Sequence, residues 1–209
     1  MLFYDCSTAP SPRRARIFIA EKGLDVETVE ISIADGAQLK PEFLAINPRG
    51  TLPVLITDDG TALSENLGIA AYLEAKFPQP PLMGITPEEK AQVLAWNSYV
   101  ELHGALPIAD ALRNSSPRMK SRAIPGPVNF EQIPELAERG RVRVGLFFDH
   151  IEQRLSEFAY LAGKSFTLPD ITALVMIEFA RVIKMSIPDC NTATLDWYQR
   201  VKSRPSAVL

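Results

Sequence analysis

Strand-like and helix-like patterns alternate along the first third of the chain. Residues 2–4 are a short apolar run, and residues 12–22 carry apolar positions three or four apart, as an amphipathic helix requires. Gly23 can end that helix in a left-handed conformation. Residues 29–33 alternate apolar with polar side chains, which predicts a strand with one buried face. The order so far is strand, helix, strand.

The next segments predict a hairpin between two helices. Residues 41–46 form a short helical stretch that ends at Asn47-Pro48-Arg49-Gly50, a typical turn sequence. Residues 52–56 and 61–63 read as strands joined by a turn that contains Asp-Gly. A helix capped by Ser64 then runs to about Phe77. The whole pattern is βαβ(α)ββα, which predicts a mixed sheet covered by helices.

Every clear pattern after residue 86 is helical. Thr86 and Glu89 have the spacing of a capping box, and Pro107 should kink or end the helix that begins there. Residues 136–155 keep apolar side chains at three-to-four spacing, which predicts one long helix with a buried stripe. Thr167 and Asp170 form a second capping box, and a last short helix covers residues 195–201. This half predicts a helical bundle.

A proline-rich segment separates the two patterns. Prolines at positions 78, 80 and 81 cannot continue a helix and favour an extended connection. We therefore expect a first domain over residues 1–78, a linker over 79–86 and an all-α domain over 87–209. A second proline-rich stretch, residues 115–134, predicts a long loop within the helical half.

The amino-acid composition excludes several classes of protein. The 209 residues are 46% apolar and 22% charged, with a formal charge of -3, which is typical of a globular protein and argues against disorder or nucleic-acid binding. The two cysteines are too few for a disulfide framework, so we expect a reducing, cytoplasmic compartment. We expect no membrane segment and no leader, because the apolar runs are short. His103 and His150 lack nearby carboxylates at ligand spacing, so we expect no metal site.

Several motifs, in this order, resemble the glutathione transferase superfamily of the bacterial cytosolic type. They are Ser11-Pro12-Arg13-Arg14-Ala15-Arg16, Ala20-Glu21-Lys22-Gly23-Leu24, Pro41-Glu42-Phe43-Leu44-Ala45-Ile46-Asn47-Pro48-Arg49-Gly50, Leu52-Pro53-Val54-Leu55, Ser64-Glu65-Asn66 and Phe166-Thr167-Leu168-Pro169-Asp170-Ile171. The resemblance covers nearly the whole chain. It implies an α/β thioredoxin-like βαβαββα domain followed by an all-α helical bundle domain.

The resemblance also implies a site for glutathione. Glu65 and Asn66 open a helix, where the free amides and the positive end of the dipole favour the γ-glutamyl carboxylate, and Glu65 can take the ammonium. The Leu52-Pro53 peptide bond would be cis, leaving the backbone of Leu52 to pair with the cysteinyl residue. Gln38 and Lys40 would reach the glycyl carboxylate. Each assignment has an alternative. Ser64-Glu65-Asn66 could only cap a helix, Pro53 could be an ordinary trans proline, and Gln38 and Lys40 could be solvated surface residues.

The group that stabilises the thiolate is less directly indicated. The catalytic Ser or Cys of many relatives aligns with Ala9, which has no donor side chain. Ser11 is the first candidate through its hydroxyl or amide, and Thr8 and Ser7 are the second. Alternatively, these hydroxyls only cap the helix, with Ser11 as the N-cap before Pro12. Cys6 lies too far from the aligned position and is interpreted as structural.

The resulting expectation is a cytoplasmic, homodimeric glutathione transferase with a role in detoxification. Glutathione would be the co-substrate, no other cofactor would be needed, and a hydrophobic electrophile would be held mainly by the helical domain. Two alternatives remain open: a glutathione-dependent disulfide or peroxide reductase, and a non-catalytic binding module with the transferase fold.

Overall fold

The computed structural model describes all 209 residues, which form two compact units. The first unit comprises residues 1–80, the segment Ile124–Asn129 and Leu209, and the second comprises residues 81–123 and 130–208. The expected boundaries at residues 78 and 87 stay a prediction. None of the helices combines the length and the apolar character needed to cross a bilayer.

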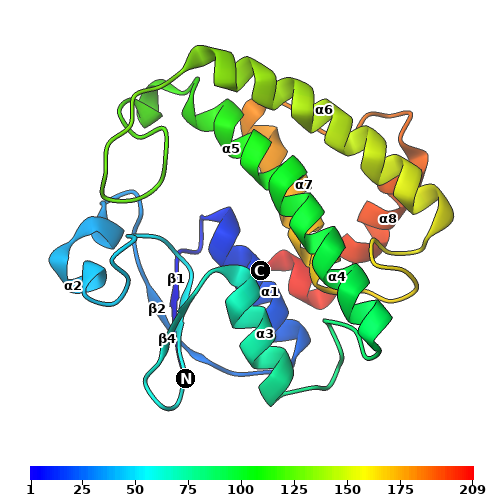
Figure 1. Cartoon of the computed structure of the whole chain (residues 1–209), viewed down its shortest axis with the longest axis horizontal. Helices are drawn as coiled ribbons and strands as arrows, with labels where there is room; N and C mark the ends of the chain where they lie inside the picture. The colour runs from blue at the N-terminus through cyan, green and yellow to red at the C-terminus, as the bar shows by residue number, and fades with distance from the viewer. The chain divides into compact units, whose positions relative to one another are not determined.

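A four-stranded mixed sheet organises the first unit (Figure 1), with the strand order β2-β1-β3-β4. The strands are β1 (Leu2–Asp5), β2 (Glu27–Glu30), β3 (Val54–Ile56) and β4 (Ala62–Ser64). β1 is parallel to β2 and antiparallel to β3, and β3 is antiparallel to β4. The mixed sheet with its helices confirms the predicted fold class of this half.

Helices α1 (Pro10–Glu21) and α3 (Asn66–Lys76) pack against each other, and the short η1 (Ala37–Leu39) and α2 (Pro41–Leu44) precede β3. A buried lysine joins the helices. The Lys22 ammonium, whose side chain is fully buried, forms an ion pair with Glu74 at 2.5 Å. It also donates to the carbonyls of Phe77 at 2.9 Å and Pro80 at 2.6 Å. A buried ammonium needs such partners to be tolerated, so the end of α1 is fixed to α3 and to the chain that follows it.

Three predicted boundaries in the first unit are wrong. Helix α1 begins at Pro10 and has Ala9 as its N-cap, so Ser11 lies within the first turn and is not the cap. Ser64 belongs to β4, and Glu65 is the N-cap of α3. β2 ends at Glu30 because its partner β1 ends at Asp5, and Ile31 and Ile33 pack against an apolar cluster beyond the strand.

Helices α4 (Pro87–Val100), α5 (Leu106–Arg113) and α6 (Pro134–Glu157) form the first part of the second unit. The predicted capping box starts α4: Glu89 donates its amide to Thr86 Oγ1 at 3.2 Å, and its carboxylate accepts from the Thr86 amide at 3.3 Å. The predicted disruption at Pro107 takes the form of a π-helical segment, η2 (Glu101–Ala105), between α4 and α5. A Cβ at Gly140 would lie 2.6 Å from the Pro107 carbonyl, so this glycine lets α6 approach α5.

Helix α7 (Leu168–Phe179) is the buried element of the helical unit, with residues 168–177 all buried. It is followed by η4 (Ala180–Ile183), α8 (Thr192–Lys202) and η5 (Pro205–Val208), and a further short η3 (Pro117–Met119) lies in the long loop before α6. The predicted capping box at the start of α7 is present. The buried Asp170 carboxylate accepts from the Thr167 amide at 3.0 Å, the Leu161 amide at 3.0 Å and Trp197 Nε1 at 2.9 Å. Asp170 thus joins three segments of the bundle.

Candidate functional site

The strand register brings Leu52 and Asn66 to the same end of the sheet as the loop that follows β1. Tyr4 pairs with Val54 across antiparallel strands, so the residues after β1 lie beside the residues before β3. Val54 also pairs with Ser64, so Leu52 and Asn66 extend beyond the same end of the β3–β4 ladder. Segments that are far apart in the chain therefore meet at this edge, which we call the sheet-edge site.

An apolar cluster holds two of these segments together. Cys6 and Leu52 are buried in one cluster with Phe43 and Val54, and Ala9 packs against it. The start of α1 is thus attached to the segment before β3. Because Cys6 is only 2% exposed, its thiol is a packing group at this edge, as predicted.

The loop between β1 and α1 is fixed by charged hydrogen bonds. Arg16 donates to Asp5 Oδ1 at 2.6 Å, to the Cys6 carbonyl at 3.2 Å and to the Ser7 carbonyl at 3.1 Å. Asp5 also accepts the Cys6 amide at 2.7 Å. Burial raises the pKa of Asp5, and the neighbouring Arg16 opposes that rise. Sequence reasoning missed this pair, for which the signal is an acidic residue at the end of a strand and an arginine in the second turn of the next helix.

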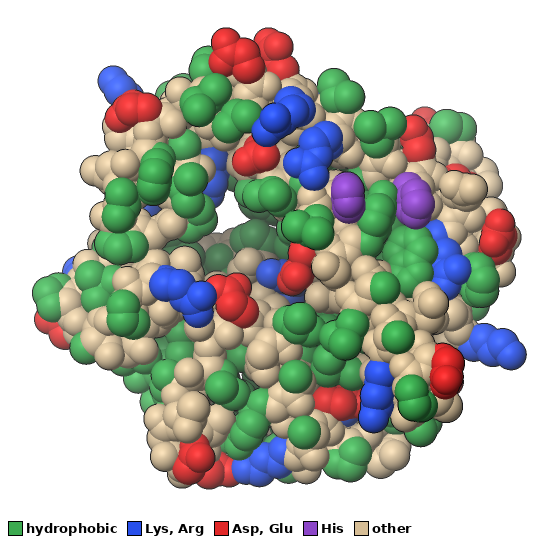
Figure 2. Space-filling view, viewed as in Figure 1, with side chains coloured by type: hydrophobic (Ala, Val, Ile, Leu, Met, Phe, Trp, Pro, Cys, Tyr) green, Lys and Arg blue, Asp and Glu red, His purple; other side chains and the backbone are tan.

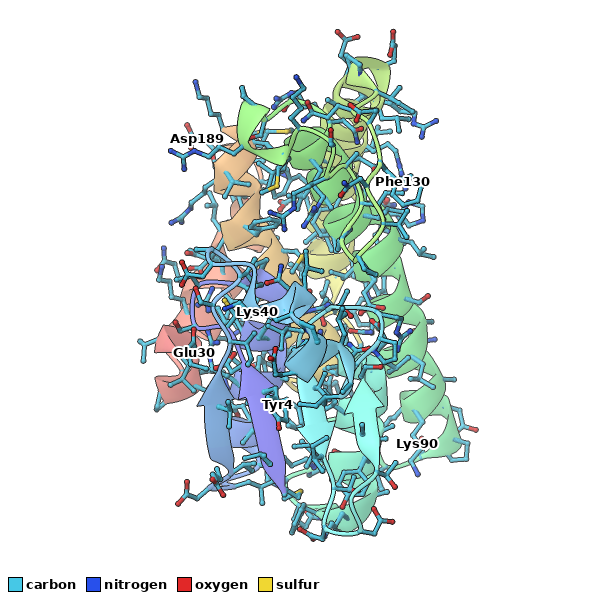
Figure 3. The ribbon with its side chains drawn as sticks, turned by 90° about the vertical axis from the view of Figure 1, so that its left-hand side faces the viewer. Tyr4, Glu30, Lys40, Lys90, Phe130 and Asp189 are labelled. Atoms are coloured by element: carbon cyan, nitrogen blue, oxygen red, sulfur yellow. The ribbon has the colours of Figure 1, made fainter.

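The three hydroxyls proposed for the thiolate differ in their partners. Ser7 is exposed, and it donates both its amide, at 2.9 Å, and its hydroxyl, at 3.1 Å, to the Glu30 carboxylate at the end of β2 (Figure 3). Thr8 Oγ1 lies 3.5 Å from Cys6 Sγ. Ser11 Oγ accepts from Arg14 Nη2 at 3.4 Å, which leaves its hydroxyl proton available. Of the three, Ser11 is the half-buried one in the first turn of α1.

The first turn of α1 offers one backbone donor. The first intrahelical bond is donated by Arg13 to the Ala9 carbonyl, at 3.3 Å. Of the preceding positions, Pro10 and Pro12 have no N–H, so only the Ser11 amide can donate to an external acceptor. Amide and hydroxyl of the same residue therefore stand at the positive end of the helix dipole.

The start of α3 differs from the start of α1 in its charged side chains and in its backbone conformation. Glu65 has φ 70° and ψ 132°, a conformation that non-glycine residues rarely adopt. Its exposed carboxylate lies 3.5 Å from Arg49 Nη1, and Arg49 also donates to the Ser64 hydroxyl. The first intrahelical bond comes from Ile69, so the amides of residues 66–68 have no intrahelical acceptor. Sequence reasoning missed Arg49, whose signal was its place in the Asn-Pro-Arg-Gly turn.

Two buried amide side chains at this unit have unsatisfied oxygens. Asn66 Oδ1 and Gln38 Oε1 are both buried and have no hydrogen-bond partner. Gln38 lies in η1, whereas Lys40 is exposed at the N-cap of α2 and has no side-chain capping bond (Figure 3). Buried polar atoms are nearly always paired in proteins, so each unpaired one requires an explanation, and a ligand that pairs with it is one. The Asn66 oxygen marks the α3 end of the sheet-edge site.

The Leu52–Pro53 peptide bond is cis. The amide and the carbonyl of Leu52 take part in no backbone hydrogen bond, and β3 begins only at Val54. The backbone of Leu52 is therefore available to an extended peptide at the start of β3, which is an inner strand between β1 and β4.

The helical unit carries a stack of aromatic and imidazole rings. The ring of Tyr99 is stacked between His103 and His150, with centroids 4.5 Å apart in both pairs. Both histidines, the only ones in the chain, are exposed at the surface (Figure 2). No three His, Cys, Asp or Glu side chains lie close enough together to hold a metal ion.

Family models, sequences of known proteins and solved structures all match this chain to glutathione S-transferases. The family "Glutathione S-transferase, N-terminal domain" matches residues 8–76, and "Glutathione S-transferase, C-terminal domain" matches residues 115–205. The chain is 37% identical over 212 residues to glutathione S-transferase 2 of Saccharomyces cerevisiae, covering 99% of this chain and 87% of that protein.

Solved structures extend the comparison. The crystal structure of Gtt2 from Saccharomyces cerevisiae superimposes with a TM-score of 0.90 at 36% identity, covering 100% of this chain and 99% of that one. A glutathione transferase homologue from sulfitobacter, solved with bound glutathione, has a TM-score of 0.82 at 21% identity and covers 99% and 94% of the two chains, which shows the shared fold.

Proposed function

Since this chain belongs to the glutathione S-transferase family and is a glutathione transferase, we propose that it conjugates the thiolate of glutathione to a hydrophobic electrophile. The reaction is a thiolate addition or substitution, in which a carbon–sulfur bond forms and the electrophile accepts the electron pair. Glutathione is the co-substrate, and no further cofactor is required. The biological role we propose is removal of reactive electrophiles.

The γ-glutamyl end of glutathione binds at the start of α3. Its carboxylate accepts from the free amides of residues 66–68, where the helix dipole is also favourable. Its ammonium pairs with Glu65. Two observations support this placement: the rare backbone conformation of Glu65, which is typical of ligand clamps, and the unpaired oxygen of the buried Asn66.

The rest of the tripeptide extends along the sheet edge. The cysteinyl residue pairs with the amide and carbonyl of Leu52, before the cis Pro53, as a short addition to the sheet. Gln38 and Lys40 bind the glycyl carboxylate, with the Lys40 ammonium providing the charge. The unpaired Gln38 oxygen is an acceptor, so it supports a donor such as the glycyl amide of the tripeptide in this region, whereas the glycyl carboxylate would accept from the Gln38 amide nitrogen.

The thiolate is stabilised at the start of α1. Lowering the pKa of a thiol from about 8.5 by two units requires about 2.7 kcal/mol. Ser11 is our first choice of donor, because its hydroxyl proton is available and its amide is the only free one in the first turn. Thr8 and Ser7 are the second choice, and the Ser7 hydroxyl is already donated to Glu30. Catalysis then rests on charge stabilisation and proximity.

One observation supports the proposal: the register of β1, β3 and β4 puts the loop after β1, Leu52 and the start of α3 at the same end of the sheet, where the buried Asn66 Oδ1 has no partner. Steady-state conjugation of reduced glutathione to 1-chloro-2,4-dinitrobenzene tests it. We expect saturable turnover in both substrates. Absence of saturable glutathione binding by calorimetry would contradict the proposal.

Glutathione-dependent disulfide reduction is the second candidate. Ala9 stands where many relatives have a catalytic side chain, and the thiol of Cys6 is buried, so the start of α1 offers no cysteine nucleophile. In this reaction the glutathione thiolate attacks a disulfide and expels one thiolate; a second glutathione then completes the reduction and glutathione disulfide forms. Faster turnover of hydroxyethyl disulfide than of the chloronitrobenzene would favour this candidate. The match to named transferases favours an enzyme over the non-catalytic binding module.

We also propose that the chain acts as a homodimer in the cytoplasm. Exposed apolar side chains near the Tyr99 stack provide a surface for a second copy, namely Leu102, Leu106, Val142 and Leu146. The two free cysteines suit a reducing compartment. Sedimentation equilibrium should give twice the mass of the chain, and Leu146→Glu should shift the protein toward monomer.

A further inference from the structure

Arg16 connects the second turn of α1 to the loop that precedes this helix. Its Nη1 donates to Asp5 Oδ1 at 2.6 Å and to the Cys6 carbonyl at 3.2 Å, and its Nη2 donates to the Ser7 carbonyl at 3.1 Å. The Asp5 side chain is 5% exposed and that of Arg16 is 17% exposed, so the ion pair is largely shielded from water. The planar guanidinium thus holds three acceptors at fixed positions, which the point-like ammonium of a lysine does not match.

The hydrogen bonds of the loop engage most of its carbonyl oxygens. The Cys6 carbonyl accepts from the Ala9 amide at 3.0 Å as well as from Arg16, and the Ala9 carbonyl accepts from the Arg13 amide at 3.3 Å. The Ser7 carbonyl is bound by Arg16. A carbonyl oxygen that faces a thiolate disfavours its negative charge, whereas an N–H group that faces it stabilises the charge. Arg16 therefore holds the negative ends of two peptide groups on itself.

Two backbone donors in the same stretch have no acceptor within the chain. They are the amide of Thr8, in the loop, and the amide of Ser11, in the first turn of α1. The loop that contains Thr8 is also attached to β2, because the Ser7 amide donates to the Glu30 carboxylate at 2.9 Å. The free donors thus belong to a segment that is fixed on two sides. Such prearranged donors stabilise a developing or bound negative charge without reorganisation.

We propose that Arg16 is a positioning residue for the transferase reaction. By binding the carbonyls of the loop, it keeps the free amides of Thr8 and Ser11 directed to the sulfur of bound glutathione. Asp5 is its counter-ion and holds the guanidinium at the loop. Arg16 acts through the backbone and contacts no substrate. The inference rests on the proposed function, because it concerns the thiolate end of the same site.

Two substitutions of Arg16 separate its shape from its charge. Arg16→Lys keeps a cation beside Asp5 but lacks the guanidinium fork, and Arg16→Gln removes the charge as well. Since the loop carbonyls are then free to turn, we expect the pKa of the bound glutathione thiol to rise by about half a unit in Arg16→Lys and about one unit in Arg16→Gln, by ultraviolet titration. Arg16→Lys serves if Arg16→Gln does not fold.

Steady-state kinetics over a range of pH separate positioning from a merely structural role. Near neutral pH, turnover at saturating glutathione should fall about threefold in Arg16→Lys and about tenfold in Arg16→Gln, and it should recover at higher pH, where the thiol ionises without help. The KM for glutathione should change less than about twofold, because both ends of the tripeptide bind elsewhere. A structural role alone would lower the melting temperature and leave the pH profile in place.

Lys22→Gln is the matched control. Lys22 is a buried cation at the other end of α1 and, like Arg16, binds one carboxylate and two carbonyls, but these belong to α3 and the chain after it. This variant should lower the melting temperature without moving the thiol pKa. Saturable glutathione turnover by the unaltered protein is measured first, so that a failure of the proposed function appears there. In a protein that turns over, an unshifted thiol pKa in the Arg16 variants, or an equal shift in Lys22→Gln, would overturn the inference.

Discussion

Buried polar groups are fully paired around Asp170 in the helical unit but not around Gln38 and Asn66 in the first unit. In the helical unit, the buried Asp170 carboxylate accepts from two backbone amides and the Trp197 indole. In the first unit, the buried oxygens of Gln38 and Asn66 have no partner, and Glu65 holds a rare backbone conformation. Satisfied buried groups stabilise a fold, whereas unsatisfied ones reduce stability unless a ligand completes them. The difference separates a structural centre from a binding site.

The largest loss of stability should come from removing the Asp170 carboxylate, whose hydrogen bonds are all made within the fold. Asp170→Ala leaves the Leu161 and Thr167 amides and the Trp197 indole without an acceptor inside the bundle. We expect a loss of about 3–5 kcal/mol in the free energy of unfolding, measured by urea denaturation. A loss below 1 kcal/mol would show that the carboxylate is not the centre of the bundle.

Glu65→Gln tests the binding site at the start of α3, where the buried polar groups are unpaired. It removes an exposed charge that has only Arg49 as a partner, so unfolding should change little, while the ammonium of glutathione loses its counter-ion. We expect the dissociation constant for glutathione to rise tenfold or more, by calorimetry, with the melting temperature unchanged. Glu42→Gln, an exposed carboxylate in α2, is the control and should bind normally. Equal affinity in the Glu65 variant would contradict the assignment.

Ser11→Ala separates the hydroxyl from the amide at the start of α1. The amide remains, so we expect a partial effect: the pKa of the bound glutathione thiol should rise by about half a unit to one unit, and turnover should fall several-fold. An ultraviolet titration of bound thiolate measures the shift. Ser11→Thr keeps a hydroxyl and should restore both values. If the titration is unchanged in Ser11→Ala, the hydroxyl is not the donor.

A smaller effect concerns Arg49, which contacts both Ser64 and Glu65. Arg49→Gln keeps a donor for Ser64 but frees the Glu65 carboxylate. We expect a change of about twofold to fivefold in glutathione affinity and little change in turnover at saturation, because the residue only positions Glu65. A large fall in turnover at saturating glutathione would instead assign Arg49 a direct role at the reacting sulfur.

The pH dependence of stability gives the smallest test. Burial raises the pKa of Asp170 to about 6, although its hydrogen bonds oppose the rise. The folded state then holds this proton at a pH where the unfolded chain has lost it, so stability from this group declines as the pH rises from about 4 to 6. We expect Asp170→Asn to remove that part of the slope in urea titrations at several pH values. An identical slope in both proteins would mean that Asp170 is ionised throughout.

The fold was largely predictable because most elements carry strong local patterns. The two capping boxes at Thr86 and Thr167 were correctly placed, since each needs only a hydroxyl and a carboxylate three residues apart. The start of α1 was predicted wrongly, because serine is a more common N-cap residue than alanine and Ser11 was therefore chosen over Ala9. The signal for the true start is Pro10, since proline is favoured at the first helical position. The conformation of Glu65 could not be predicted, because it is unfavourable for glutamate.

The site was predictable only through the resemblance. Nothing local shows that Leu52 and Asn66 share an edge, because the register of β3 on β4 follows from pairing in space. The fixed loop made by Arg16 and Asp5, and the unpaired oxygens of Gln38 and Asn66, likewise depend on packing between distant segments. Sequence patterns can name such residues, but their hydrogen-bonding state requires the structure.

A crystal structure with reduced glutathione is the most direct test of the central claim. We expect the γ-glutamyl group at the first turn of α3, the cysteinyl backbone paired with Leu52, and the sulfur within hydrogen-bonding distance of the Ser11 amide or hydroxyl. A tripeptide bound elsewhere, or a sulfur held by another group with Ser11 out of reach, would contradict it.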